Sequence, residues 1–281
     1  MQIFKHIVDL QLWLATQRKA GNPIAFIPTM GALHQGHLTL VEAGQQSGAL
    51  TVVSIFVNPT QFNDPKDLEK YPRTPERDLE LLLGVQCDAV FMPEVSEIYP
   101  SGKSLTVHLD FGTMEKVMEG KFRPGHFNGM ATVVKRLLDI VQPSQLYMGQ
   151  KDYQQLSIVR QMLHLLGSTV ELVMVPTVRE KDGLAMSSRN VRLSAEMRQK
   201  APFLYEILSK TAALVSEGNV RSLEQTAMEK LKYEGFDPEY VEIIDGKTLL
   251  PLEEGTVGAL PVICMAVWAE EVRLIDNVLV P

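Results

Sequence analysis

The chain has 281 residues, of which 45% are apolar and 22% charged, and this is the ordinary mixture of a globular protein. Its 27 Lys and Arg residues against 34 Asp and Glu residues give a net charge of −7, the wrong sign for binding nucleic acid mainly through phosphate neutralisation. Disordered and fibrous classes are therefore excluded, and nucleic acid is not an expected partner.

The first part of the chain alternates short apolar runs with segments of helical length. Residues 23–28 form an apolar run closed by proline, and residues 36–47, which lead to Gly48, predict a helix. Residues 50–57 are continuously apolar and rich in β-branched side chains. That pattern is typical of a strand covered on both faces, so we expect this strand in the middle of a sheet.

The alternation continues to about residue 175. Helices are predicted over residues 76–83, 129–141 and 153–166, and strands over residues 89–92, 105–109, 146–148 and 170–175. Strands that alternate with helices favour a parallel sheet with right-handed crossovers. The fold class predicted for this part is therefore α/β, a Rossmann-like doubly wound parallel sheet.

The pattern changes after Pro176. A polar loop at residues 179–183 precedes two helical segments near residues 195–216 and 222–233, and residues 240–244, 262–268 and 272–280 are predicted as strands without helices between them. Consecutive strands without crossover helices indicate an α+β arrangement. We therefore predict two domains, a Rossmann-like domain over residues 1–176 and a smaller C-terminal α+β domain over residues 177–281.

Several features bear on the compartment. Cys87 and Cys264 lie in apolar runs far apart in the sequence, which indicates buried thiols in a reducing compartment and not a disulfide framework. The first residues lack the pattern of a signal peptide, and no apolar stretch is long enough to cross a bilayer. We expect a cytoplasmic protein with no membrane partner.

The sharpest motif is His34-Gln35-Gly36-His37, between the first strong strand and its helix. Ligands of doubly wound folds bind at the carboxyl ends of the strands, where a helix N-terminus attracts phosphate. Two imidazoles there could donate hydrogen bonds to a phosphate whose charge grows in a transition state. A capped turn with packed histidines is the alternative. A zinc site is disfavoured because no further His or Cys cluster has ligand spacing, and the loop is neither a dinucleotide fingerprint nor a P-loop.

Other polar motifs follow predicted strands or precede helices. They are residues 58–62 (Asn-Pro-Thr-Gln-Phe), residues 121–129 with two cations and a histidine, residues 149–155 (Gly-Gln-Lys-Asp-Tyr-Gln-Gln) and residues 186–190 (Met-Ser-Ser-Arg-Asn). Amides at a strand end can bind a hydroxyl and a carboxylate without adding charge, and Lys, Ser and Arg suit phosphate. Taken singly, each motif also fits a turn, a surface lysine or a helix cap.

Six motifs in one order resemble the pantothenate synthetase family over nearly the whole chain. They are residues 34–37, 58–62, 71–74 (Tyr-Pro-Arg-Thr), 123–127 (Arg-Pro-Gly-His-Phe), 149–155 and 186–190. The first and last are more distantly similar to the two signatures of class I aminoacyl-tRNA synthetases and nucleotidyltransferases. The resemblance implies an ATP-dependent ligase of coenzyme A biosynthesis that joins D-pantoate to β-alanine through a pantoyl-adenylate and releases AMP and pyrophosphate. It also implies Mg²⁺ and a homodimer.

The resemblance assigns site residues position by position. ATP binding falls to Met30, Gly31, Ala32, Leu33, His34, Gln35, Gly36, His37, Gly149, Gln150, Lys151, Asp152, Val178, Met186, Ser187, Ser188 and Arg189. His37, His34 and Lys151 would be catalytic, Gln61 and Gln155 would bind pantoate, and Gln61 would also border the β-alanine site. Metal ligands stay open, because Asp78 matches an acidic position near the family's metal site but equally fits a helix-surface carboxylate.

Two departures from the family pattern are Gln35 and Gln150, where members often have Glu. We expect Gln35 to point away from the site and Gln150 to remove a charge beside the nucleotide. Because the clamp-like residues 187–189 lie beyond the predicted boundary, we expect the C-terminal domain to act as a lid. Two other hypotheses stand beside the ligase: a nucleotidyltransferase that releases a dinucleotide-like product, and a non-catalytic nucleotide sensor. A tRNA synthetase is disfavoured by the short C-terminal part and the negative charge.

Overall fold

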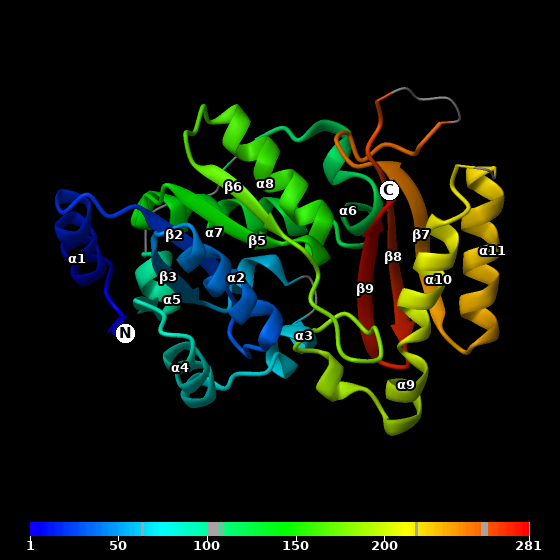
Figure 1. Ribbon diagram of the computed structural model, residues 1–281, viewed down its shortest axis with the longest axis horizontal. Coiled ribbons are helices and arrows are strands. Elements are labelled where there is room, and N and C mark those ends of the chain that lie inside the picture. Colours follow the sequence, from blue (N-terminus) through cyan, green and yellow to red (C-terminus); the bar gives the residue numbers. More distant parts are fainter. Residues whose placement is uncertain (63–64, 101–106, 108, 217–218, 254–257, 281) are drawn as a thin grey trace. The chain divides into compact units, whose positions relative to one another are not determined.

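The computed structural model describes residues 1–62, 65–100, 107, 109–216, 219–253 and 258–280. The chain forms two compact units, each described separately below (Figure 1). The first unit comprises residues 1–111, 123–149 and 158–175, and the second comprises residues 112–122, 150–157 and 176–281. The domain division at Pro176 stays a prediction.

The first unit is built on a six-stranded sheet with the order β1-β4-β3-β2-β5-β6, and every strand pair is parallel. Its strands are β1 (Gln2–Phe4), β2 (Ile24–Thr29), β3 (Leu50–Ile55), β4 (Ala89–Phe91), β5 (Gln145–Gly149) and β6 (Glu171–Val175). The predicted α/β class and the central position of the strand near residue 50 are confirmed. The order reverses between β2 and β5, which makes their carboxyl ends the topological switch point where open α/β sheets bind ligands.

Helices connect the strands, and those at residues 35–46, 75–84, 126–141 and 153–165 lie where the sequence predicts them. The helices are α1 (Ile7–Lys19), α2 (Gln35–Gln46), α3 (Pro65–Lys70), α4 (Pro75–Gly84), α5 (Val95–Ile98), α7 (His126–Val141) and α8 (Tyr153–Leu165), the last of which contributes to both units. Helix α2 lies close to the sheet at Gly44, where an added Cβ would lie 3.0 Å from the Cβ of Ala25 and 3.2 Å from Thr51 Cγ2. This close packing holds the helix that begins in the histidine motif firmly against β2 and β3.

The second unit contains an antiparallel sheet of β7 (Asp237–Asp245), β8 (Pro261–Ala269) and β9 (Val272–Leu279), in that order. Helices α6 (Met118–Phe122), α9 (Ala195–Lys200), α10 (Phe203–Ala212) and α11 (Val220–Tyr233) complete it. Leu204, Leu231 and Ile263 belong to its apolar core. In Figure 1 the three strands are drawn side by side, with β9 at one edge of the sheet. Residues of β9 contact two segments that carry predicted site residues.

The structure differs from the predicted elements in several places. Strand β1 and helices α1, α3, α5 and α6 were not predicted from the sequence. The single helical segment expected near residues 195–216 is two helices, because Pro202 lacks an N–H group and its ring clashes with a preceding carbonyl in a continuous helix. The strand expected over residues 105–109 lies mostly outside the described residues, of which only Val107 and Leu109 fall in that range.

The thiols and the helix lengths bear on the expected environment. Cys87 in the first unit and Cys264 in the second are both free and buried, as the sequence predicts. Burial raises the pKa of Cys87 to about 11 and also raises the pKa of Cys264. Among the described residues, no helix combines the length and the apolar character needed to cross a membrane.

Candidate active site

The histidine motif follows a sharp loop after β2 and forms the N-cap and first turn of α2. Gly31 has a φ of +80° and Ala32 a φ of +49°, so two consecutive residues adopt the left-handed conformation. Thr29 supports the turn, because its hydroxyl oxygen accepts a hydrogen bond from the Gly31 N–H (3.2 Å) and its hydroxyl donates to the Ser54 carbonyl (2.7 Å). The result is a helix that begins directly at the carboxyl end of a central strand, with His34 as its N-cap.

Asp78 of α4 holds this loop from the inside. Its carboxylate accepts hydrogen bonds from the N–H groups of Ala32 (2.9 Å) and Leu33 (2.8 Å) and from the Thr74 hydroxyl (3.0 Å), and the residue is 1% exposed. An added Cβ at Gly31 would lie only 3.0 Å from an Asp78 oxygen. Asp78 is therefore a buried acceptor that shapes the loop, and the interpretation as a helix-surface carboxylate is wrong.

The two histidines of the motif contact each other. The His34 N–H donates to His37 Nδ1 at 3.3 Å, and the ring centroids lie 4.0 Å apart with the planes inclined at 42°. Because Nδ1 accepts a hydrogen bond, a neutral His37 carries its proton on Nε2. His37 can therefore offer an N–H donor close to the N-terminus of α2, where the helix dipole also favours an anion.

Gln61 lies in the short helix η1 (Pro59–Gln61) and is 8% exposed. Its amide oxygen accepts from Asn58 Nδ2 at 3.2 Å, and its Nε2 lies 3.0 Å from the sulfur of Met30. His126 Nδ1 donates to its carbonyl oxygen at 2.9 Å. Close packing against α7 fixes the segment, since a Cβ at Gly129 would lie 2.4 Å from the Thr60 carbonyl oxygen. The structure thus brings the motifs at residues 58–62 and 123–127 into contact within the first unit, next to Met30.

Lys151 lies in the second unit, in the short helix η3 (Gln150–Asp152) that follows β5. The lysine is partly exposed, and its Nζ lies 3.9 Å from Asp152 Oδ2. The side chain of Gln150, in contrast, is buried and donates to Asn277 Oδ1 at 3.1 Å. This departure from the family pattern therefore has a structural partner in the second unit.

Val178 and Met186 close a small hairpin in the same unit. The Met186 N–H donates to the Val178 carbonyl (3.0 Å), and Arg179 pairs with Ala185 in an isolated antiparallel bridge. In the turn that follows, Ser187 Oγ accepts a hydrogen bond from the Arg189 N–H at 3.2 Å. The residues whose hydroxyl and guanidinium groups are predicted to bind phosphate therefore follow directly after a hydrogen-bonded hairpin.

The first turn of α8 carries two adjacent glutamines with different environments. Gln154 is buried; its amide oxygen accepts from the Glu119 N–H (2.9 Å) and its Nε2 donates to the Met114 (2.8 Å) and Val117 (2.9 Å) carbonyls. Gln155 is half-buried. Gln154 therefore anchors the segment of residues 112–119 and leaves Gln155 as the candidate for contact with substrate.

The described residues contain no group of three or more His, Cys, Asp or Glu side chains that could hold a metal ion. Mg²⁺ is commonly bound through one or two carboxylates together with substrate phosphates. Both oxygens of Asp78 already accept hydrogen bonds from the protein, whereas Asp152 has an exposed carboxylate. This donor set suits a cation that arrives with a triphosphate better than one held by the protein alone.

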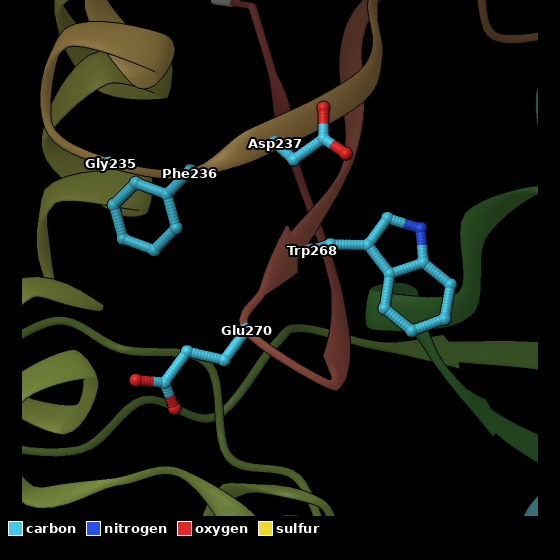
Figure 2. Close-up of a pocket in the computed structure, with 5 residues that line it drawn as sticks. All are labelled: Gly235, Phe236, Asp237, Trp268 and Glu270. Atoms are coloured by element: carbon cyan, nitrogen blue, oxygen red, sulfur yellow. The ribbon is translucent and has the colours of Figure 1, made fainter.

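A pocket of about 550 Å³ lies within the second unit. Figure 2 shows its lining, in which two aromatic rings and two carboxylates come from the start of β7 and the end of β8: Gly235, Phe236, Asp237, Trp268 and Glu270. None of the residues that the sequence assigns to the site lines this pocket, and the charged groups of its lining residues are carboxylates. It is therefore not the candidate active site.

The family model for pantoate-beta-alanine ligase matches residues 2–279. The chain belongs to the pantoate-beta-alanine ligase family. Its relatives include a pantothenate synthetase from Porphyromonas gingivalis, 44% identical over 279 residues and 99% of each chain. The pantoate–beta-alanine ligase of Schizosaccharomyces pombe is 43% identical over 281 residues, which cover 99% of this chain and 98% of that protein.

Solved structures of the same family have the same fold. A pantothenate synthetase from Thermus thermophilus superposes with a TM-score of 0.92 at 43% identity and covers 100% of this chain and 99% of that one. A pantoate-beta-alanine ligase from Francisella tularensis, crystallised with beta-gamma ATP and beta-alanine, has a TM-score of 0.83 at 34% identity and covers 99% and 97%. The resemblance inferred from six motifs and the predicted fold class are therefore confirmed.

Sequence reasoning missed the roles of two sets of residues that hold the site segments, although it named Asp78 as a match to an acidic position near the family's metal site. Asp78 had a weak signal, because a carboxylate in the first turn of a helix commonly binds N–H groups nearby. Asp276 and Asn277 also had a signal, since they are adjacent polar residues in an otherwise apolar predicted strand. That pattern indicates a buried polar contact but does not name the partner.

Proposed function

We propose that the protein catalyses the ATP-dependent condensation of D-pantoate with β-alanine to give pantothenate, with a pantoyl-adenylate as intermediate and AMP and pyrophosphate as the other products. The observation that carries this proposal is the match of the family model over residues 2–279. Relatives at 43–44% identity over nearly the whole chain support it. Pantothenate is a precursor of coenzyme A, so the reaction belongs to coenzyme A biosynthesis.

The first step needs alignment more than activation. A carboxylate with a pKa near 4 is ionised at neutral pH, so the pantoate oxygen can attack the α-phosphorus of ATP directly. A P–O bond forms to pantoate while the bond to the β-phosphate oxygen breaks and pyrophosphate leaves. Most of the catalysis then comes from in-line positioning and from stabilising charge on the phosphate oxygens.

We assign the stabilising donors of the first unit to His34 and His37. Because the His34 N–H donates to His37 Nδ1, a neutral His37 ring carries its proton on Nε2, and this N–H group can donate a hydrogen bond to a phosphate oxygen. The backbone of the loop, in which Asp78 accepts the Ala32 and Leu33 N–H groups, would bind ATP beside them. The ATP contacts proposed for this loop are Met30, Gly31, Ala32, Leu33, His34, Gln35, Gly36 and His37.

We assign the cationic contacts to Lys151 and Arg189 in the second unit. An ammonium acts as a point charge on phosphate, and a guanidinium can bind phosphate through two N–H groups. The ATP contacts proposed for this unit and for the end of β5 are Gly149, Gln150, Lys151, Asp152, Val178, Met186, Ser187, Ser188 and Arg189. The proposal further includes closure of the C-terminal lid, which would exclude water from the hydrolysable adenylate.

Gln61 and Gln155 are proposed to bind pantoate. Neutral amides can donate to its carboxylate and exchange hydrogen bonds with its hydroxyls without quenching the attacking charge. In the second step the amine of β-alanine, with a pKa near 10, must lose a proton before it attacks the adenylate carbonyl. The new C–N bond forms as the bond to AMP breaks, and we place the β-alanine site beside Gln61.

We further propose that the enzyme uses Mg²⁺, forms a homodimer and is located in the cytoplasm. Mg²⁺ would be held mainly by the triphosphate, with an exposed carboxylate such as Asp152 within the donor set. The resemblance supports a homodimer. Two buried thiols and the absence of a disulfide from this pair support the cytoplasm, where thiols stay reduced.

Leaving out β-alanine allows the two half-reactions to be measured separately. With ATP, Mg²⁺ and pantoate but no β-alanine, we expect one equivalent of pyrophosphate per active site and an adenylate that stays bound. Adding β-alanine should then release pantothenate and AMP. Pyrophosphate that appears only after β-alanine is added contradicts the two-step route. A free adenylate or dinucleotide as final product would support the nucleotidyltransferase alternative, and ATP binding without turnover would support the nucleotide sensor.

A further inference from the structure

Asn277, on the edge strand β9, holds the backbone of the turn that carries Lys151. Its Nδ2 donates to two successive carbonyls, Gln150 O at 3.0 Å and Lys151 O at 2.8 Å, while its Oδ1 accepts from Gln150 Nε2 at 3.1 Å. Carbonyl oxygens only accept, so the orientation of the Asn277 amide is determined by its partners. Asn277 is 2% exposed, and its two hydrogen bonds with Gln150 are buried.

The preceding residue, Asp276, holds the hairpin that leads to Met186 and Arg189. Its carboxylate binds the Arg179 guanidinium with both oxygens, at 2.6 and 3.0 Å, and Arg179 also donates to the Gly183 carbonyl at 3.2 Å. The guanidinium carbon lies 3.7 Å from the centre of the Tyr205 ring. Burial raises the pKa of Asp276, and the ion pair with Arg179 opposes this effect.

The two contacts are linked through the strand itself. The Asn277 N–H donates to Asp276 Oδ1 at 2.7 Å, and the Asn277 carbonyl accepts from Arg179 Nη2 at 3.3 Å. Two neighbouring residues of one strand therefore determine the positions of two segments that are far apart in the sequence. Buried polar groups are costly unless they are fully hydrogen-bonded. A strand that served only to pack against an apolar core would therefore not need Asp and Asn side chains at these two positions.

We propose that Asp276 and Asn277 are positioning residues for adenylation, which set the Lys151 turn and the hairpin before Ser187–Arg189 in one fixed relation. The inference rests on the proposed function, because that function places Lys151 and Arg189 on the phosphates. Neither Asp276 nor Asn277 touches substrate in this scheme. Instead they fix the position of the backbone that carries Lys151 and Arg189. This matters for the rate because a misplacement of roughly 1 Å at a reacting centre can slow a reaction about 100-fold.

The first test is Asn277→Ala, with Asn277→Asp as a variant of nearly unchanged volume. Neither side chain can donate to the Gln150 and Lys151 carbonyls. We expect the single-turnover rate of pyrophosphate release to fall by roughly 10- to 100-fold, while the dissociation constant of ATP changes less than about threefold. If Asn277→Ala does not fold, Asn277→Asp carries the same test.

A double-mutant cycle separates positioning from general stability. If Asn277 acts through Lys151, then adding Asn277→Ala to Lys151→Ala should slow adenylation by no more than about twofold beyond Lys151→Ala alone. The loss of thermal stability should nevertheless be the same in both backgrounds. By the same reasoning, Asp276→Asn should have little further effect on the rate in an Arg189→Ala background.

Glu224→Ala is the matched control. Glu224 is a buried carboxylate of the same unit that accepts the Ile243 N–H at 2.7 Å and pairs with Arg221, so its partners belong to neither segment. We expect this variant to lose stability but to keep its adenylation rate within about twofold.

Three outcomes would overturn the inference: an unchanged rate in both Asn277 variants, the same fold-loss with and without Lys151, or an equal loss of rate in Glu224→Ala. The unsubstituted protein is assayed first with ATP, pantoate and β-alanine. Its failure to form pantothenate would contradict the proposed function and would be distinct from these three outcomes.

Discussion

The histidine loop and the Lys151 turn both follow strands of the same parallel sheet, but they are held in different ways. The loop after β2 is fixed by its own left-handed residues and by Asp78, which is only 45 residues from Leu33 in the sequence. The turn after β5 is fixed by Asn277, which lies 127 residues beyond Gln150. The first support comes from the next strand–helix repeat and the second from the end of the chain.

The difference shows that the residue which holds a binding motif can lie near the motif in the sequence or far from it. A helix that begins at a strand end needs one buried acceptor for its loop N–H groups, and a neighbouring helix can supply it. A turn whose carbonyls point inward needs buried donors, and Asn supplies two from one side chain. The first unit therefore keeps its site almost self-contained, whereas the second unit depends on its terminal strand.

The largest effect is expected where the first unit acts on the chemistry directly. His37→Ala removes the Nε2–H donor and should lower the single-turnover rate of adenylation by about 10²- to 10³-fold, the scale of losing one oriented transition-state donor. ATP binding should change much less. Quench-flow measurement of pyrophosphate tests this, with the exposed His164→Ala as control, which should retain the full rate. A folded His37→Ala protein with an unchanged rate removes His37 from the mechanism.

A smaller effect is expected for the local support. Asp78→Asn places an amide N–H against the backbone N–H groups of Ala32 or Leu33 and should lower the free energy of unfolding by about 1–3 kcal/mol, the cost of a buried unsatisfied group. Urea denaturation measures the change.

The matched control is Asp139→Asn, which breaks a surface pair with Lys135 in the same unit and should cost less than about 1 kcal/mol. Equal losses in the two variants would show that the loop does not depend on Asp78 and would weaken the contrast between the two units.

The smallest effect concerns the hairpin. The amides of Glu180 and Met186 already donate within the hairpin, whereas residues 187–190 carry the proposed phosphate contacts, so nucleotide should add protection mainly over residues 187–190. At ten times the dissociation constant, ATP should slow exchange there by roughly tenfold, while α11 stays unchanged. Hydrogen exchange followed by mass spectrometry measures both. Identical exchange with and without ATP would leave the segment a static linker and not part of a lid.

The fold was largely predictable because its strands carry strong local patterns. The strand near residue 50 was recognised from its unbroken β-branched run, and its central position follows from that. The break at Pro202 was predictable in principle, because proline cannot continue a helix, but the apolar periodicity on both sides obscured it.

The site was predictable only as far as local motifs reach. The His34 motif and the Lys151 turn each mark a strand end, so their residue types could be assigned to chemistry. The role of Asp78 required knowing which N–H groups face α4. To predict the role of Asn277, one would have to know that β9 is an edge strand. One would also have to know that its Asn277 side chain contacts a turn more than one hundred residues earlier in the chain.

Each unit carries one buried cysteine, and this arrangement provides a built-in reporter. Alkylating reagents attack the thiolate, and a pKa of about 11 keeps Cys87 almost wholly protonated at neutral pH. Cys264 is likewise buried and protonated, so neither sulfur should react until its own unit opens. Peptide mapping after a short pulse of iodoacetamide along a urea series would then record two separate unfolding curves from one unlabelled protein. Simultaneous modification would mean that the two units melt as one cooperative block, and staggered modification would identify the weaker unit.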